Sequence, residues 1–322
     1  RFATDKLMEE GAHPFERLPE TGKKIAVIGA GPAGLACAHR LAMYGHNVFI
    51  LDGRQKAGGL NEFGIAAYKA TNDFAAEEVK WLMKIGGIEL ELGKELGRDF
   101  SLDALKSDFD AVFIACGLPD VNVLGVAGEN KENVEDAISF ISRLRQSEDL
   151  SELPVGRHVV VIGGGMTAVD AAVQSKLLGA EQVHLVYRRE KEAMKASKYE
   201  QNVAASKGVN IMTNAQPVAI LGDKAVKEVE FIYTENYDGN ILESNESFRL
   251  KADQVFKAIG QKPEIIDGPL TLKNGKVVID KNGKTSIAGV WAGGDCVGDG
   301  EDLTVTAVAQ GRDAAEDIHK EI

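Results

Sequence analysis

The stretch from Ile25 to Gly34 reads I-A-V-I-G-A-G-P-A-G, an apolar run of strand length that leads into a glycine-rich turn. A helix-compatible run, Leu35 to Leu41, follows directly. In this context Gly29 permits a tight turn, Gly31 lets the backbone approach a pyrophosphate, and Gly34 lets the helix pack closely on the strand. The stretch therefore predicts a dinucleotide site at the N-terminus of a helix.

A near-copy of this stretch occurs later in the chain. Val159 to Ala168 reads V-V-V-I-G-G-G-M-T-A, and Ala168 stands in the place of the third glycine, where a small side chain still allows close helix packing. One such motif predicts a dinucleotide, whereas two predict transfer between dinucleotides.

The residues that follow each copy indicate different nucleotides. Asp52 ends the apolar run Asn47 to Leu51, at the spacing where a carboxylate binds a ribose, although a solvated strand-end aspartate is the alternative. The second copy has Arg188 and Arg189 instead, and two guanidinium groups can pair with a 2′-phosphate. Ordinary surface basicity is the alternative for them. We therefore predict FAD at the first site and NADP(H) at the second.

Two further motifs support this duplicated architecture. Buried strands ending in A-x-G are predicted at Asp110 to Gly117 and Lys251 to Gly260, one in each half of the chain. Gly289 to Asp295 (G-V-W-A-G-G-D) precedes a predicted helix at Leu303 to Lys320. A carboxylate there could bind the ribityl chain of a flavin, and the helix N-terminus could stabilise negative charge on the ring.

The pattern predicts an α/β fold with two Rossmann-like domains, the second inserted into the first. We assign 1–22 to an N-terminal tail, 23–124 and 258–322 to the FAD-binding domain, and 125–257 to the NAD(P)H-binding domain. Helices are also expected at Asp73 to Gly87 and Asn133 to Gln146. A small antiparallel meander is expected from Val209 to Asn214, Val226 to Thr234 and Ser247 to Leu250.

Composition narrows the class of protein. The 322 residues carry a formal net charge of -12, which argues against sequence-independent nucleic-acid binding. No apolar run approaches the roughly 20 residues that span a bilayer, so we expect a cytoplasmic location and no membrane partner. Cys37, Cys116 and Cys296 lie far apart without a C-x-x-C or metal-ligand spacing. This spacing predicts no metal site and no thiol pair, and so argues against a flavoprotein disulfide reductase.

The chain resembles the two-dinucleotide-binding flavoproteins, within them the group of the NADPH-dependent glutamate synthase small subunit and the FAD/NADP half of dihydropyrimidine dehydrogenase. The resemblance covers nearly the whole chain. It rests on G-G-L-N-E-F-G-I-A-A-Y-K (58–69), G-G-G-M-T-A-V-D-A-A-V-Q-S-K-L-L-G-A (163–180) followed by V-Y-R-R, F-R-L-K-A-D-Q-V-F-K-A-I-G-Q (248–261), and V-W-A-G-G-D-C-V-G (290–298). Ala66 and Met166 stand where glutamate synthase small subunits usually carry Pro and Asp, which favours the dihydropyrimidine side.

Both the motifs and the resemblance assign site residues. The expected FAD contacts are Gly29, Gly31, Pro32, Ala33, Gly34, Asp52, Gly53, Gly59, Leu60, Lys69, Leu96, Gly117, Gly294, Asp295, Thr304 and Val305. The expected contacts of the nicotinamide nucleotide are Gly163, Gly164, Gly165, Met166, Thr167, Arg188, Arg189, Lys195, Ala258, Ile259 and Gly260. No side chain is assigned a catalytic role, because hydride transfer requires geometry more than acid–base chemistry. Lys69 could tune the flavin, with a plain surface lysine as the alternative.

The resemblance implies an electron-input module in which NAD(P)H reduces FAD and iron–sulfur clusters carry electrons to a partner. The partner would contain FMN and reduce uracil or thymine, or would be a glutamate synthase large subunit or an electron-bifurcating relative. The donor could be NADH instead of NADPH. A nucleotide-binding redox sensor that does not turn over is the alternative from another functional class. The clusters would belong to an N-terminal domain outside this chain, whose end Arg1 to Glu10 matches. An ordinary docking helix is the alternative for that segment.

Overall fold

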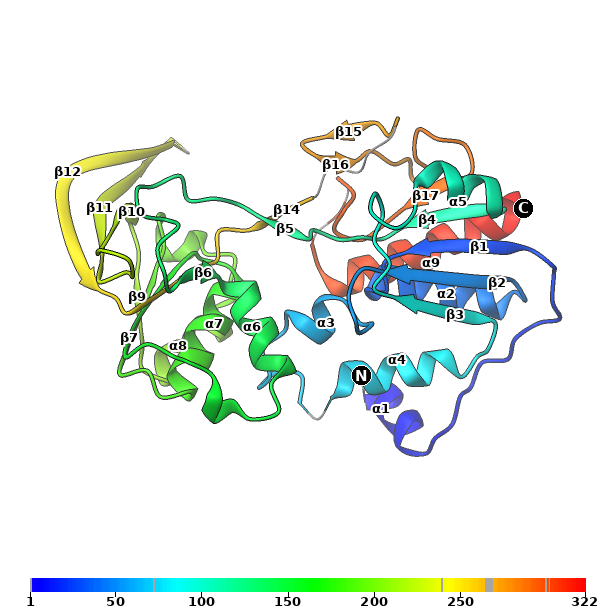
Figure 1. The fold of residues 1–322 in the computed structure, drawn as a ribbon, viewed down its shortest axis with the longest axis horizontal. Helices are drawn as coiled ribbons and strands as arrows, with labels where there is room; N and C mark the ends of the chain where they lie inside the picture. The colour runs from blue at the N-terminus through cyan, green and yellow to red at the C-terminus, as the bar shows by residue number, and fades with distance from the viewer. Residues whose placement is uncertain (1, 72, 239, 264–268, 299, 301) are drawn as a thin grey trace. The chain divides into compact units, whose positions relative to one another are not determined.

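The computed structural model describes residues 2–71, 73–238, 240–263, 269–298, 300 and 302–322 (Figure 1). They form two compact units. Unit 1 comprises Arg1–Glu62, Ala70–Asp120 and Lys262–Ile322, and unit 2 comprises Phe63–Lys69 and Val121–Gln261. Each unit contains a five-stranded sheet, so the predicted α/β fold with the second unit inserted into the first is confirmed. Within the described ranges, no helix has both the length and the apolar character needed to cross a bilayer.

The sheet of unit 1 is parallel throughout and has the strand order β17-β4-β1-β2-β3. Its strands are β1 (Lys24–Ile28), β2 (Asn47–Asp52), β3 (Ile88–Leu92), β4 (Ala111–Ile114) and β17 (Val290–Ala292). The helices of this unit are α1 (Phe2–Glu9), α2 (Pro32–Met43), α4 (Phe74–Met83), α5 (Leu102–Asp108) and α9 (Thr304–Glu321), and α3 (Leu60–Phe63) leads out of it (Figure 1).

Both faces of β1 are buried, which explains its continuous apolar sequence. Ile25 and Val27 pack in one core with residues of α2 and α9. Ala26 and Ile28 pack in a second core that contains Leu102 of α5. A parallel strand covered on both sides has no polar face to alternate with, so it reads as an unbroken hydrophobic run.

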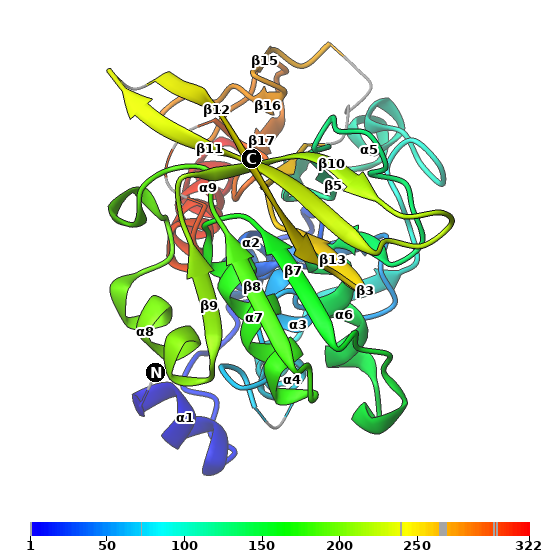
Figure 2. The same ribbon diagram turned by 90° about the vertical axis from the view of Figure 1, so that its left-hand side faces the viewer.

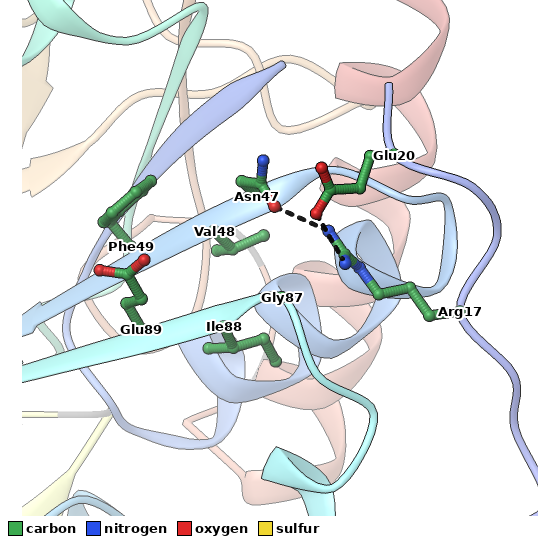
Figure 3. A pocket seen from close by; sticks show the side chains of 8 residues that line it. All are labelled: Arg17, Glu20, Asn47, Val48, Phe49, Gly87, Ile88 and Glu89. Carbon is green, nitrogen blue, oxygen red and sulfur yellow. Dashed lines mark hydrogen bonds and ion pairs between the residues drawn. The ribbon is translucent and has the colours of Figure 1, made fainter. Parts of the chain in front are cut away.

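The N-terminal segment is held to unit 1 by polar contacts. The indole N–H of Trp81 donates to the carbonyl of Ala12 at 2.7 Å, and Trp81 is buried as expected. Arg17 Nη2 donates to Asn47 Oδ1 at 2.7 Å, beside a cavity of about 260 Å³ (Figure 3). Glu20 and Glu89 also line this cavity. Two carboxylates beside a guanidinium group that already has partners argue against an anion site there.

Unit 2 repeats the design of unit 1. Its parallel sheet has the order β6-β13-β7-β8-β9, and Figure 2 shows β13, β7, β8 and β9 side by side. The strands are β6 (Val134–Asp136), β7 (His158–Ile162), β8 (Gln182–Val186), β9 (Val209–Met212) and β13 (Gln254–Lys257). The helices are α6 (Ala137–Gln146), α7 (Met166–Leu177) and α8 (Lys198–Ser206), with short 3-10 turns at Leu150–Glu152 and Lys191–Ala193.

One prediction for unit 2 was wrong in its strand assignment. Val209–Met212 (β9) is an edge strand of the parallel sheet, not part of the antiparallel meander. The meander consists of β10 (Ala215–Leu221), β11 (Glu228–Tyr237) and β12 (Asn240–Lys251). It packs on the sheet face opposite the helices, since Phe231 shares a core with Val160 of β7. Short apolar runs do not reveal the sheet to which a strand belongs, because partners are chosen by tertiary packing.

Several short elements were not predicted. Val134–Asp136 forms β6 where a helix start was expected, because it pairs in parallel with β13. β15 (Leu272–Lys273) pairs with β16 (Lys276–Val277) in a hairpin. β5 (Asp120–Val121) pairs with β14 (Gln261–Lys262), where the chain passes between the units.

Candidate dinucleotide sites

The two glycine turns are built in the same way. Gly29 has φ +104° and Gly163 has φ +150°, a region that favours glycine. A Cβ at Gly29 would lie 2.3 Å from the carbonyl oxygen of Ala115, and one at Gly163 would lie 2.2 Å from that of Ala258. In each unit the A-x-G strand end therefore lies against the first glycine of the turn. The repeat seen in the sequence is a repeat in three dimensions.

The expected FAD contacts belong to unit 1, except Lys69, which belongs to unit 2. α2 begins after Gly31, and among the residues that the structure describes no side chain caps this helix end. Its first-turn N–H groups can therefore receive a phosphate. A Cβ at Gly59 would lie 2.7 Å from Gly31 Cα, so the loop before α3 crosses the turn at a distance that requires glycine. This open cradle fits the pyrophosphate of a dinucleotide.

Asp52 orders the same turn. Its Oδ2 atom accepts a 2.6 Å hydrogen bond from the N–H of Ala30, and its Oδ1 atom accepts one of 2.8 Å from the N–H of Arg54. Each carboxylate oxygen has a second lone pair, so Asp52 keeps acceptor capacity for ribose hydroxyls.

The other expected FAD contacts of unit 1 lie on loops and element ends. Gly294 and Asp295 follow β17, and Thr304 and Val305 begin α9, whose N-terminus has no side-chain cap within the described ranges. Thr304 Oγ1 donates to Asn61 Oδ1 at 3.1 Å. Burial, followed by repulsion from Asp302, raises the pKa of Asp295. The structure also places Pro32, Ala33 and Gly34 in the first turn of α2, Gly53 after β2, Leu60 at the start of α3, Leu96 after β3 and Gly117 after β4.

Lys69 is part of unit 2, where it is ion-paired. Its Nζ atom lies 2.7 Å from Asp170 Oδ1 and 2.7 Å from Glu200 Oε1. The Tyr68 hydroxyl donates to the same Asp170 oxygen at 2.7 Å. Burial lowers the pKa of Lys69, but the hydrogen bonds to both carboxylates outweigh burial and raise it overall. Lys69 therefore holds the segment Phe63–Lys69 on α7 and α8 as a stable cation.

The second site is a cavity of about 980 Å³ within unit 2. It is lined by Gly163, Gly164, Gly165, Thr167, Arg188, Arg189, Lys195, Ala258, Ile259 and Gly260, which are all expected contacts. Met166 is the one expected residue of this set outside the lining, although it begins α7 and is 44% exposed. The cavity has the volume of a ligand pocket for a large molecule.

Arg188, Arg189 and Lys195 are three of the cations that line this cavity. Among the residues that the structure describes, the side chains of Arg188, Arg189 and Lys195 form neither a hydrogen bond nor an ion pair. The main chain of the two arginines is nevertheless held in place by hydrogen bonds. Thr234 Oγ1 donates to the carbonyl of Arg188 at 2.8 Å, and the N–H of Asn214 donates to that of Arg189 at 3.1 Å. Unpaired cations on a fixed backbone make a site for an anion.

Residues that the motifs did not reveal complete this cavity. Asn122 to Ala127 line one part of it, and Gln216 and Glu243 line another, where Gln216 Nε2 donates to Glu243 Oε1 at 2.6 Å. Glu129 accepts hydrogen bonds of 2.8 Å from the N–H groups of Leu124 and Gly125 and so holds the first of these segments. Only the parallel sheet and the meander together bring these residues to one cavity, so no local pattern marks them.

The spacing of the cysteines does not reveal where they lie in the fold. All three are free thiols, and Cys116 and Cys296 lie near each other in unit 1. They come from the ends of two paired strands, β4 and β17, far apart in the chain. Spacing in sequence therefore could not reveal this proximity.

Comparison with known proteins places the chain in a family. Residues 23–311 match the family described as pyridine nucleotide-disulphide oxidoreductase, and the chain belongs to this family. It is an FAD-dependent NAD(P)H oxidoreductase. It is 35% identical to the glutamate synthase [NADPH] small chain of Escherichia coli K12, over 99% of this chain and 73% of that protein.

Two further proteins are similar. The NAD-dependent dihydropyrimidine dehydrogenase subunit PreT of Escherichia coli O157:H7 is 30% identical, over 99% of this chain and 73% of that protein. The solved structure of Mycobacterium tuberculosis FprA in complex with NADPH superposes with a TM-score of 0.78 at 17% identity, covering 93% of this chain and 84% of that one. The similarity to FprA is evidence for the fold only.

Proposed function

We propose that unit 1 holds FAD and that the cavity of unit 2 binds NADPH as the electron donor. The observation that carries this assignment is a set of three cations, Arg188, Arg189 and Lys195, which have no side-chain partner among the described residues and line the same cavity as a glycine turn. A 2′-phosphate is the feature of NADPH that such a set recognises, since guanidinium groups bind phosphate in a bidentate manner.

The residues of each unit would bind and orient their nucleotide. In unit 1, the first turn of α2 would bind the pyrophosphate, Asp52 the ribose and Asp295 the ribityl chain. Bound FAD would supply a two-electron acceptor that can pass electrons onward. In unit 2, the first turn of α7 would bind the pyrophosphate of NADPH, and Arg188 and Arg189 would fix its adenosine half. No side chain needs to move a proton.

Electrons would leave through iron–sulfur clusters to a partner subunit, and we propose an FMN-containing partner that reduces uracil or thymine. Ala66 and Met166 support this assignment, because they depart from the usual residues of glutamate synthase small subunits. PreT, one of the similar proteins, is named as a subunit of a dihydropyrimidine dehydrogenase. A glutamate synthase large subunit is the second candidate partner, favoured by the 35% identity to that enzyme's small chain.

Anaerobic titration with NADPH and NADH in parallel tests the core of the proposal. We expect the flavin absorbance to bleach, and at lower concentrations of NADPH than of NADH. An unbleached flavin would contradict the role of electron donor, and a stronger response to NADH would contradict the 2′-phosphate assignment.

A separate experiment tests the partner. The protein would be isolated with the subunit that co-purifies with it, and NAD(P)H oxidation would be followed after addition of uracil or thymine. Oxidation that depends on the pyrimidine supports the assignment. If neither pyrimidine stimulates oxidation while the flavin still bleaches, the pyrimidine assignment is wrong and the electron-donor assignment stands.

A further inference from the structure

Lys195 lies on a loop that is fixed to the glycine turn of unit 2. The loop connects β8 to α8. The Lys195 side chain is exposed, whereas its neighbours Met194 and Ala196 are buried in the core around α7. The N–H of Ala196 donates to the carbonyl of Gly164 at 3.0 Å. An exposed cation is therefore carried on a backbone that is tied to the turn lining the same cavity.

Tyr187 connects the same loop to the same turn. Its hydroxyl donates to the carbonyl of Ala193 at 3.0 Å, two residues before Lys195. A Cβ at Gly164 would lie 2.5 Å from Cδ2 of Tyr187, so the ring packs directly on the turn. The N–H of Tyr187 donates to the carbonyl of Met212 at 2.8 Å, which fixes its own backbone to the parallel sheet. The hydroxyl thus fastens the loop, and the ring supports the turn.

The two arginines are held independently of this hydroxyl. The carbonyl of Arg188 accepts from Thr234 Oγ1 on β11, and the carbonyl of Arg189 accepts from the N–H of Asn214. Neither contact involves the loop between β8 and α8. Loss of the Tyr187 hydroxyl should therefore act on Lys195 and leave the arginines in place.

We propose that Tyr187 is a positioning residue that raises the preference for NADPH over NADH, because its hydroxyl orders the loop that carries Lys195. The inference rests on the proposed assignment of NADPH to this cavity. A cation on an ordered loop loses less conformational entropy when it binds a phosphate. NADH has no 2′-phosphate, so its binding does not gain from this order.

Calorimetry with NADP⁺ and NAD⁺ on the FAD-loaded protein tests the proposal through binding. Tyr187→Phe removes the hydroxyl and keeps the ring on the turn. We expect the Kd for NADP⁺ to rise about fivefold, the effect of one lost hydrogen bond, and the Kd for NAD⁺ to stay within about twofold. Tyr199→Phe removes a hydroxyl from a tyrosine of the same unit that is 77% exposed, and is the control. In steady-state assays with NADPH, the change should appear in KM and not in kcat.

A second variant shows whether Tyr187 acts through Lys195. Lys195→Met alone should weaken NADP⁺ and spare NAD⁺. In the Lys195→Met protein, Tyr187→Phe should have no further effect on NADP⁺, because the cation that it positions is gone. Two residues that act through one contact are expected to be non-additive in this way.

The failure of this inference differs from the failure of the proposed function. The positioning role is wrong if Tyr187→Phe weakens both nucleotides equally, weakens neither, or adds its full effect to that of Lys195→Met. The NADPH assignment itself is wrong if Lys195→Met and the joint replacement of Arg188 and Arg189 by Ala also leave the preference between NADP⁺ and NAD⁺ unchanged.

Discussion

The carboxylate of Asp52 accepts a 2.6 Å hydrogen bond from the N–H of Ala30, in the glycine turn of unit 1. An acidic residue at the end of β2 thus orders the turn after β1, in addition to the ribose contact that we propose for it. The two roles can be separated by comparing the protein with and without FAD.

Replacing Asp52 by Ala should destabilise the FAD-free protein. The N–H of Ala30 would lose its acceptor, and such a loss costs about 1–3 kcal/mol. Urea unfolding of the FAD-free protein measures this cost, and FAD binding should weaken as well. Asp108→Ala, an exposed change in the same unit, is the control. Equal stability of the two variants would show that Asp52 does not order the turn.

Replacing Gly31 by Ala should leave the fold intact and weaken FAD binding. Gly31 has φ -80°, and its nearest neighbour to an added Cβ is Gly59 Cα at 3.8 Å, an ordinary contact. The methyl group would, however, occupy the cradle. Gly29→Ala should instead destabilise the protein itself, because its Cβ would clash with Ala115. Melting curves and FAD fluorescence titrations separate the two effects, and normal FAD affinity in Gly31→Ala would refute the proposed site.

Replacing Arg188 and Arg189 together by Ala should weaken NADPH far more than NADH. A charge-assisted hydrogen bond contributes about 1.5–3 kcal/mol, so we expect the KM for NADPH to rise on the order of 100-fold. The KM for NADH should change only slightly. Lys207→Ala with Lys224→Ala removes the same charge from exposed positions of unit 2 and is the control. Equal losses for both nucleotides would contradict the 2′-phosphate role.

Replacing Glu243 by Gln should improve NADPH binding. Glu243 brings a negative charge to the cavity that contains Arg188 and Arg189, and its removal favours a phosphate dianion. Because Glu243 is exposed, we expect an effect of only about threefold, and one that shrinks as salt is added. Parallel titrations with NADPH and NADH measure it. Glu246→Gln on the same strand is the control, and identical behaviour of the two variants would argue against a role for Glu243.

Replacing Lys69 by Met should destabilise unit 2 most near neutral pH. Asp170 is buried, and it would lose its cationic partner together with Glu200, at a cost of about 2 kcal/mol. The pKa of Glu200 is lowered in the folded protein: burial opposes this, but the hydrogen bond from Lys69 outweighs it. Its contribution to stability is therefore present above its unfolded pKa and lost as the pH falls through the folded value.

The loss of this stabilisation at alkaline pH comes from Lys69 itself. Its pKa is raised in the folded protein, so its contribution is complete below its unfolded pKa and is lost as the pH rises through the folded value. The difference in stability between wild type and Lys69→Met should therefore shrink at acidic and at strongly alkaline pH. Urea unfolding across this pH range measures the difference. Lys80→Met, which removes the exposed ion pair between Lys80 and Glu77, is the control. A difference that is independent of pH would show that packing, and not charge, explains the loss.

The sequence by itself determined the two strand–turn–helix units and the residues of their glycine turns. These features are local: a tight turn, a close helix and a buried parallel strand each require particular residue types within a short stretch, as Gly29 and Gly163 show. Arg188 and Arg189 could be placed beside the second turn for the same reason, because the carboxyl ends of neighbouring parallel strands share one edge of the sheet.

Only the tertiary structure decided which distant residues meet. It placed β9 in the parallel sheet and β10 in the meander, brought Glu243 to the cavity of Arg188, and paired Lys69 with Asp170 and Glu200. It also brought together the strand ends that precede Cys116 and Cys296, which lie far apart in the sequence. The physical reason is common to all of these contacts. Strand pairing and packing between layers depend on the free energy of the whole core, and no local pattern of residues records that energy.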